Sequence, residues 1–223
     1  LARTHAAISR IRSALDNYRF NEAASELYGF VWNELCDWYL EFSKGTLYND
    51  DQPKLQQGAI DTLYKVFHAI TRLMHPIMPF LSEELWQRLP DTEGFIIHSS
   101  YPKAEEFPAN QDALDQVAFL QEVITEVRRV RAEMGLKNSV KLNIRSPFAD
   151  KLQGQEKGLF DLCGVDSVVV GEKEGACVTI VVDAMSFYIP LMGIIDVDEE
   201  KKRLTKKIED EEKSIGRLKG RLG

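Results

Sequence analysis

The sequence is poor in cysteine and contains no paired metal-ligand motif. Its three cysteines, Cys36, Cys163 and Cys177, lie far apart and form no CxxC pair and no cluster with histidine. Separated cysteines in odd number are typical of reduced intracellular thiols. The four histidines are also scattered, and no nucleophile stands beside a base at a motif spacing. The sequence therefore indicates no metal site and no catalytic centre.

Long apolar runs and an excess of positive charge are also missing. No apolar run reaches the roughly 18 to 20 residues of a membrane span, and the start has no secretory signal, so we expect a cytoplasmic protein with no membrane partner. The formal charge of -7 excludes a generally basic nucleic-acid coat, because a polyanion would be repelled by the mean field. Any contact with nucleic acid must therefore use a local patch.

The region 1–89 has the hydrophobic spacing of helices. Its apolar residues recur at intervals of three and four. Breaks at 16–17, 44–53 and 75–79, where prolines remove backbone donors, divide the region into four helices. The short connections favour an antiparallel helix bundle. Because Leu1 already lies inside a helical pattern, we expect the chain to be cut from a longer polypeptide.

A second unit follows a linker over 90–111 that carries proline, glycine and polar residues. Its predicted elements are a helix over 112–134 and strands over 139–144, 168–170, 177–182 and 187–190. We expect the segment 171–175 to be the turn between two of these strands and 187–190 to add a short edge. Together these elements predict a small α/β module.

The last segment has the pattern of one coiled-coil strand. From Val197 apolar residues are spaced by sevens, fours and threes. One such helix cannot bury its apolar seam alone, so the return helix is expected beyond Gly223; packing on the α/β module is the alternative. The predicted fold is therefore mainly α, with an antiparallel helix bundle and linker over 1–108, a small α/β module over 109–196 and the start of a coiled coil over 197–223.

Three parts of the sequence resemble valyl-tRNA synthetase, a class I aminoacyl-tRNA synthetase. The segments 18–24 and 30–41, YRFNEAA and FVWNELCDWYLE, are similar to that family's anticodon-binding domain, and the CDWY run separates it from the isoleucyl and leucyl relatives. The segment 74–86, MHPIMPFLSEELW, resembles a motif of the whole subclass. The segment 189–200, IPLMGIIDVDEE, resembles the entry to the family's terminal coiled coil. The resemblance spans nearly the whole chain, and the order of its parts agrees.

The resemblance implies the carboxy-terminal, tRNA-binding fragment of an enzyme that activates valine with ATP and Mg²⁺, esterifies it to tRNA(Val) and hydrolyses mischarged threonine in an editing domain. The family's two nucleotide-binding signatures, a His-small-Gly-His tetrapeptide and a Lys-Met-Ser-Lys-Ser loop, are missing from the sequence, and so is a GxxxxGK[ST] loop. We therefore expect the fragment alone to be inactive and to hold no cofactor.

The expected partners are tRNA(Val) and the catalytic and editing domains of the same polypeptide, and the chain is expected to be a monomer. The family reads the central adenine of the anticodon and the base that follows it. Sequence alone does not locate the residues that read these bases.

The entrance of the second predicted helix holds the first group of candidate tRNA-binding residues. They are Arg12, Tyr18, Arg19, Phe20 and Asn21. An aromatic ring can stack on an unstacked loop base, Arg and Asn can read its edge, and solvated cations can meet phosphate. The alternatives are structural: Phe20 as a hydrophobic staple, Asn21 as a helix cap and Tyr18 in the core, with Arg12 and Arg19 as plain surface residues.

A second candidate group, Lys202, Arg203 and Lys206, lies at the start of the coiled coil. Basic residues outnumber acidic ones between 198 and 221, in contrast to the acidic balance of the rest of the chain, and this favours contact with a tRNA backbone. A solvated coiled-coil face is the alternative. The cluster Arg128, Arg129 and Arg131 likewise has two interpretations: contact with the tRNA backbone, or a solvated helix face.

Other aromatic residues of the bundle are assigned to its core: Trp32, Trp38, Tyr39 and Trp86. The rival function is a non-catalytic protein-interaction scaffold, because an acidic helical module with a heptad tail has much the same composition. A tRNA binder should present a cationic stripe from the Arg12 and Arg19 region towards the coiled coil, whereas a scaffold should expose an apolar patch.

Overall fold

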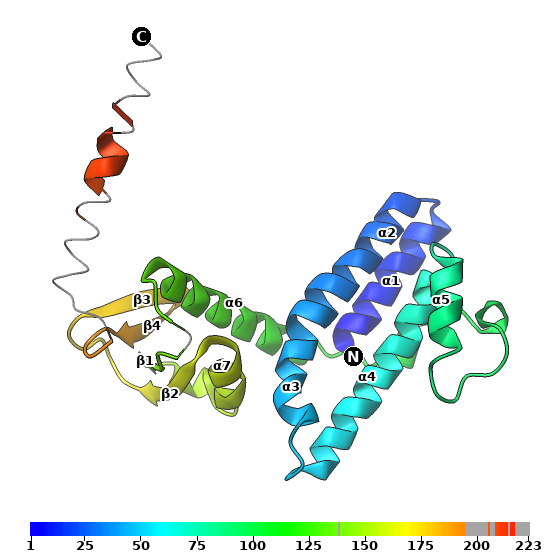
Figure 1. Ribbon diagram of the computed structural model, residues 1–223, viewed down its shortest axis with the longest axis horizontal. Coiled ribbons are helices and arrows are strands. Elements are labelled where there is room, and N and C mark those ends of the chain that lie inside the picture. Colours follow the sequence, from blue (N-terminus) through cyan, green and yellow to red (C-terminus); the bar gives the residue numbers. More distant parts are fainter. Residues whose placement is uncertain (138, 195–204, 206–207, 214, 217–223) are drawn as a thin grey trace. The chain divides into compact units, whose positions relative to one another are not determined.

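The computed structural model describes residues 1–137, 139–194, 205, 208–213 and 215–216 (Figure 1). Contacts within the chain divide it into two compact units, Leu1–Leu120 and Gln121–Gly223. The division falls inside α6 (Gln111–Glu133). None of the described helices is long and apolar enough to cross a membrane.

The first unit is a helix bundle, as predicted. Its helical elements are α1 (Ala2–Asp16), α2 (Phe20–Gly29), the π-helical segment η1 (Phe30–Leu40), α3 (Glu41–Leu47), α4 (Pro53–Met74) and α5 (Pro79–Trp86). Since α2, η1 and α3 follow one another without a break, these elements form the four helices that the periodicity predicts. Their shared core includes Ile8, Ile11, Leu27, Ile70 and Leu73.

The helix ends follow from local sequence. Pro53 and Pro79 occupy the first turns of α4 and α5, where a missing backbone donor leaves no bond unmade. At the end of α1 the Asn17 side chain donates to a carbonyl one turn back, and the Arg19 backbone nitrogen donates to the Ala14 carbonyl at 2.8 Å. These bonds end α1 and aim the chain into α2.

The linker after α5 is ordered and irregular, as predicted. It includes the short 3₁₀ turns η2 (Ile96–His98) and η3 (Ala104–Glu106). The buried Arg72 of α4 fastens it, because one guanidinium nitrogen donates to the Ser100 carbonyl at 3.0 Å and another pairs with the Glu106 carboxylate at 3.0 Å. The planar guanidinium of arginine can donate to two different acceptors in this way.

The second unit combines helices with a mixed four-stranded sheet in the order β2-β1-β4-β3. Besides the end of α6, its elements are β1 (Leu142–Ser146), η4 (Ala149–Leu152), α7 (Glu156–Cys163), β2 (Val165–Val170), β3 (Cys177–Val182) and β4 (Met185–Pro190). β1 and β2 are parallel, with α7 in the connection between them, and β4 pairs antiparallel with β1 and β3. One face of the sheet is buried, with Leu142, Ile144, Ile180, Phe187 and Ile189 at its centre.

The predicted α/β module is confirmed, but two of its connections were predicted wrongly. The segment 171–175 does not join neighbouring strands, because β2 and β3 lie at opposite edges of the sheet. The hairpin is instead β3–β4, across Asp183 and Ala184. The segment 187–190 lies in the central strand β4 rather than at an edge, since it must bury Phe187 and Ile189. α7 was not predicted.

Most of the predicted coiled coil falls outside the described residues. Within 197–223, the described residues 205, 208–213 and 215–216 are helical. The coiled coil therefore stays a prediction, as do the domain limits drawn at 108 and 196.

Candidate nucleic-acid interface

The turn between α1 and α2 holds two aromatic rings out in solvent. Tyr18 is 81% exposed and has a positive φ of 57°, a conformation that costs a residue with a Cβ about 1–2 kcal/mol. Phe20, the first residue of α2, is 61% exposed. The two rings meet edge to face, with centroids 6.2 Å apart and an interplanar angle of 83°. The turn thus presents a fixed aromatic corner at the helix entrance.

The structural alternatives for these residues are wrong. Tyr18 is not in the core and Phe20 is not a buried staple, because both rings are mostly exposed. The residue that precedes α2 is Arg19, and no side-chain hydrogen bond caps this fully described helix, so Asn21 is not its cap. Asn21 lies exposed in the first turn of α2. Both rings and the Asn21 amide are therefore accessible to a ligand.

A second pair of exposed rings lies further along the same helix. Tyr28 and Trp32 are 66% and 55% exposed and stack with centroids 6.3 Å apart at an angle of 10°. Asn21 precedes Tyr28 by two helical turns, so it lies on the same face of α2. The prediction that Trp32 belongs to the core is wrong, whereas Trp86 is buried as predicted. We call Tyr18, Phe20, Tyr28 and Trp32 the aromatic face.

The remaining two predicted core aromatics, Trp38 and Tyr39, are half-buried. Tyr39 packs against the bundle core, and Trp38 stacks on Phe42 with ring centroids 5.9 Å apart. A run of aromatics at helical spacing is thus divided between the core and the surface. Trp32, Trp38 and Tyr39 all lie in the π-helical segment η1, and Trp32 is the one that lies mostly in solvent.

The cations beside the aromatic face are engaged within the protein. Arg12 is half-buried, donates to the Pro102 carbonyl at 3.0 Å and lies 5.5 Å from the centre of the Tyr101 ring. Arg19 pairs with Glu22 at 2.8 Å. Glu22 also adds a negative charge to the first turn of α2, where a phosphate would otherwise be attracted. The geometry therefore favours stacking on bases over binding of phosphate at this entrance.

The second candidate group, Lys202, Arg203 and Lys206, lies outside the described residues. Its role in tRNA binding stays a prediction, as does that of the first group. The cationic stripe expected to join the two groups is likewise a prediction, because its far end belongs to undescribed positions.

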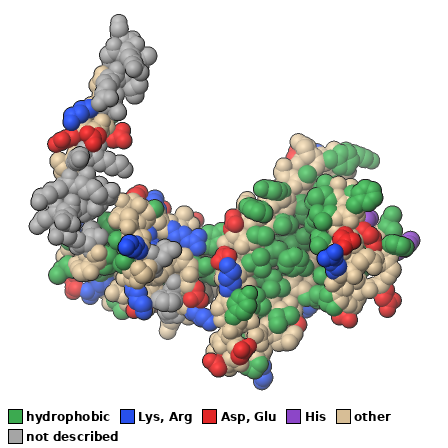
Figure 2. Space-filling model, viewed as in Figure 1, with side chains coloured by type: hydrophobic (Ala, Val, Ile, Leu, Met, Phe, Trp, Pro, Cys, Tyr) green, Lys and Arg blue, Asp and Glu red, His purple; other side chains and the backbone are tan. Residues whose placement is uncertain are grey.

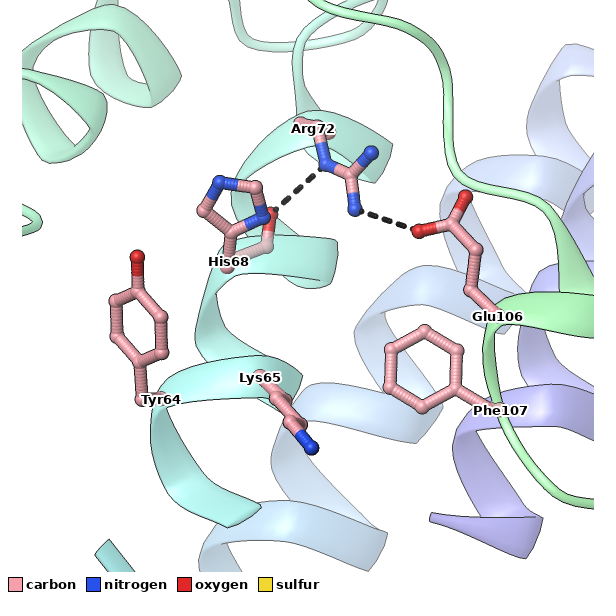
Figure 3. A pocket seen from close by; sticks show the side chains of 6 residues that line it. All are labelled: Tyr64, Lys65, His68, Arg72, Glu106 and Phe107. Atoms are coloured by element: carbon pink, nitrogen blue, oxygen red, sulfur yellow. Dashed lines mark hydrogen bonds and ion pairs between the residues drawn. The ribbon is translucent and has the colours of Figure 1, made fainter. Parts of the chain in front are cut away.

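The first unit also contains a cavity of about 350 Å³ (Figure 3). It is lined by Tyr64, Lys65, His68, Arg72, Glu106 and Phe107. The nitrogens of Arg72 are directed to the protein itself, to the carboxylate of Glu106 and to carbonyls (Figure 3). The His68 ring stacks on Trp86 with centroids 4.8 Å apart, and burial lowers the pKa of His68, helped by the nearby Arg72 charge. We therefore assign this cavity a structural role, because its Arg72 holds the linker to α4.

No chemistry of a metal enzyme is built into the part of the chain that the structure describes. No group of three or more His, Cys, Asp or Glu side chains there could hold a metal ion. The free thiol of Cys163 is buried, and burial raises its pKa to about 11, which makes it a poor nucleophile at neutral pH.

Residues 1–146, the helix bundle with its linker, α6 and β1, match the family described as the anticodon-binding domain of tRNA ligase. The chain belongs to this family.

Its relatives over the whole sequence are valine–tRNA ligases. The chain is 36% identical to the enzyme of Carboxydothermus hydrogenoformans over 231 residues and 35% identical to that of Thermotoga maritima over 224 residues, and both comparisons cover all of it. It is 35% identical to the enzyme of Syntrophotalea carbinolica over 212 residues, which cover 91% of the chain. The chain spans about a quarter of the length of these relatives, from 24% to 26%.

Proposed function

We propose that this chain is the tRNA-binding, carboxy-terminal part of a valine–tRNA ligase. In this role it recognises the anticodon of tRNA(Val) and positions the tRNA for ATP-dependent aminoacylation by the rest of the enzyme. The aromatic face on α2, in a domain of the anticodon-binding family, carries the proposal. ATP and Mg²⁺ would bind to the catalytic domain, so this chain alone would be inactive.

In the proposed mechanism, unstacked anticodon bases settle on the exposed rings. Base–aromatic stacking contributes about 1–3 kcal/mol per base, so two stacked bases would supply much of a micromolar affinity. Stacking tolerates any base, and selectivity must come from polar groups beside the rings. The Asn21 amide on α2 and the Arg19 guanidinium are the nearest such groups among the predicted site residues. The mechanism is positional, with no bond made or broken in this chain.

The rival scaffold function has one observation in its favour. The corner between α4 and α5 exposes apolar side chains, and Phe80 is 89% exposed. Its members are Ile77, Met78, Phe80, Leu81 and Leu85. Figure 2 shows hydrophobic side chains over much of this face of the first unit. A surface of this kind is typical of a protein contact.

We assign this apolar corner to the remaining domains of the ligase rather than to a separate partner. The relatives are about four times as long as this chain, so the rest of a ligase would offer a large permanent contact surface. The corner is built mainly from aliphatic side chains, whereas the aromatic face carries flat rings with amide and guanidinium groups beside them. Two surfaces of different chemistry fit two different partners.

The proposal is tested by titrating the chain with a tRNA(Val) transcript and with one whose central anticodon base is changed. Each titration is run at about 50 mM and about 200 mM salt. The native transcript should bind more tightly, and the ratio of the two affinities should change little with salt, because stacking and edge contacts release few counterions. Equal affinities at both salt concentrations would contradict anticodon recognition by this chain.

A variant of the apolar corner separates the two surfaces. Phe80→Gln removes an exposed ring that lies off the aromatic face, so binding of the native transcript should be unchanged. In the complete ligase the same change should lower the melting temperature, since it places an amide in the contact with the other domains. A loss of tRNA affinity without any change in the complete enzyme's stability would contradict the assignment.

A further inference from the structure

The second unit contains a cavity of about 510 Å³ between the end of α6 and the end of α7. Two arginines of α6, Arg128 and Arg131, line it one turn apart, on the same face of the helix. Asp161 is the one carboxylate among the described lining residues. The cavity therefore carries an excess of positive charge.

Arg131 is a buried cation with no acidic partner among the residues that the structure describes. It is 6% exposed and donates to the carbonyl oxygens of Val140, at 2.8 Å, and of Lys137. No carboxylate of the described residues forms an ion pair with it. Carbonyl dipoles solvate a guanidinium but do not neutralise its charge, and a buried net charge is costly. An anion in the cavity would supply the missing charge.

Gly164 lies directly against the guanidinium group of Arg131. A Cβ at this position would lie 3.1 Å from a guanidinium nitrogen of Arg131, and the φ of Gly164 is +69°. Both features require glycine here. The neighbouring Cys163 adds no negative charge, because burial raises the pKa of its thiol to about 11. The wall is thus compatible with an anion.

Arg128 is held at the same cavity by the protein backbone. Its Nε donates to the Leu162 carbonyl at 3.0 Å, which fixes the plane of the guanidinium. Lys137, in the loop that Arg131 holds, is exposed and makes no ion pair within the described residues. Arg129 differs, because it faces outward and pairs with Glu126 and Glu133, each at 2.7 Å. The cluster thus separates into two cavity arginines and one arginine of a solvated face.

We propose that the cavity lined by Arg128 and Arg131 binds a phosphate group, and that its source is a backbone phosphodiester of the bound tRNA. Arginine forks match the oxygens of phosphate and form short charge-assisted hydrogen bonds. This inference rests on the proposed function for the identity of the RNA. The competing reading is that both arginines only satisfy carbonyls at the ends of α6 and α7.

The test compares Arg128→Gln with Arg129→Gln in the complete 223-residue chain. With a tRNA(Val) transcript, Arg128→Gln should weaken binding about 5- to 10-fold and reduce the slope of log affinity against log salt by about 0.7–0.9, the share of one phosphate contact. Arg129→Gln should change neither. Arg131→Lys, which keeps the buried charge, should lower affinity less than Arg128→Gln if it folds, as checked by circular dichroism.

Inorganic phosphate distinguishes the possible sources. In the wild-type chain, phosphate should shift the amide resonances of Ala132 and Gly164, and Arg128→Gln should abolish these shifts. If phosphate shifts them but Arg128→Gln leaves tRNA affinity unchanged, the RNA source is wrong. If phosphate causes no shift and the two variants bind tRNA alike, the arginines only satisfy carbonyls and the site is refuted. Arg128→Gln should lower the affinity equally for the native transcript and for one with a changed anticodon. A failure of anticodon recognition would therefore leave the effect of Arg128→Gln intact, and the two proposals can fail independently.

Discussion

At the scale of single residues, the unusual feature of α2 and the segment that follows it is a pair of large aromatic rings on the surface. Tyr28 and Trp32 stack on each other while more than half of each ring stays in solvent. Such a pair gains about 0.5–1.5 kcal/mol from ring contact, which is little for two large apolar side chains left in water. The pair therefore adds little to the stability of the fold and could add more to the affinity for a ligand with flat faces.

Replacing Trp32 with alanine should separate binding from stability. Because the side chain is 55% exposed, we expect the free energy of unfolding to fall by only about 0.5–1.5 kcal/mol, the range of the lost ring contact. The free energy of tRNA binding should weaken by about 1–3 kcal/mol if one base stacks there. Urea unfolding and a filter-binding titration measure the two quantities.

Tyr48→Ala is the matched control, since Tyr48 is an exposed aromatic residue that follows α3 and lies off the aromatic face. It should leave both stability and tRNA affinity near the wild-type values. Equal losses of affinity in the Trp32 and Tyr48 variants would mean that exposed rings bind RNA without a defined site.

His68 should make the first unit sensitive to mild acid. Burial lowers its pKa below 6.5, the nearby Arg72 charge lowers it further, and Glu106 acts in the opposite direction. Because the folded-state pKa lies below the unfolded value, the unfolded chain takes up the proton first, and stability falls as the pH drops below about 6.5. The melting temperature of the wild-type chain should therefore decrease between about pH 7 and about pH 5.5.

In His68→Gln this decrease should be smaller, even if the melting temperature is lower at all pH values because the ring contact with Trp86 is lost. His98→Gln, at an exposed position of the linker, should keep the wild-type dependence on pH. The same slope in all three proteins would show that another group is responsible.

At the scale of elements, segments with a long periodic pattern or a proline at the start were predictable, whereas the short helix α7 was not. α1, α4 and α6 are long enough for three- and four-residue spacing to show, and prolines mark the first turns of α4 and α5. α7 has eight residues and was missed. Without α7 the parallel pairing of β1 with β2 could not be predicted, so the hairpin was placed after β2 instead of after β3. Sheet order is a tertiary property.

The candidate site shows the same division. The residue types at the entrance of α2 predicted base stacking. Whether each aromatic side chain is exposed or buried could be decided only from the backbone conformation. Tyr18 is exposed in a turn with a positive φ, and Trp32 is exposed although Trp38 and Tyr39 of the same π-helical segment are half-buried. Neither feature has a signal in the sequence. The pairing of Arg12 with Pro102, 90 residues away, could not be predicted either, because it depends on the course of the linker.

The β3–β4 hairpin offers a test of one element. Asp183 and Ala184 both have positive φ, 47° and 61°, as a two-residue type I′ turn requires, and alanine is a poor residue for that conformation. Ala184→Gly should stabilise the hairpin by about 0.5–1 kcal/mol. Hydrogen exchange of the β3 and β4 amides in the whole chain measures the change.

Gly175→Ala should have the opposite effect, since Gly175 precedes β3 with a φ of +60°. Slower exchange in Ala184→Gly and faster exchange in Gly175→Ala would support the turn geometry. Faster exchange in both variants would contradict it.

At the scale of the whole molecule, the chain combines two units with different surfaces. The first carries the aromatic face and the apolar corner, and the second carries the arginine-lined cavity. The net charge of -7 means that the chain as a whole cannot hold RNA by its mean field, so recognition must be local. We therefore expect base stacking to determine selectivity and a few phosphate contacts to determine the dependence on salt.

The most direct test of the central claim places 2-aminopurine at the centre of the tRNA(Val) anticodon and follows its fluorescence during titration with the chain. The account predicts quenching on binding to the wild-type chain and to Tyr48→Ala, and loss of that quenching in either Phe20→Ala or Trp32→Ala, because the base stacks on one of the two ring pairs of the aromatic face. Binding of the tRNA with unchanged 2-aminopurine fluorescence would contradict anticodon recognition by this chain.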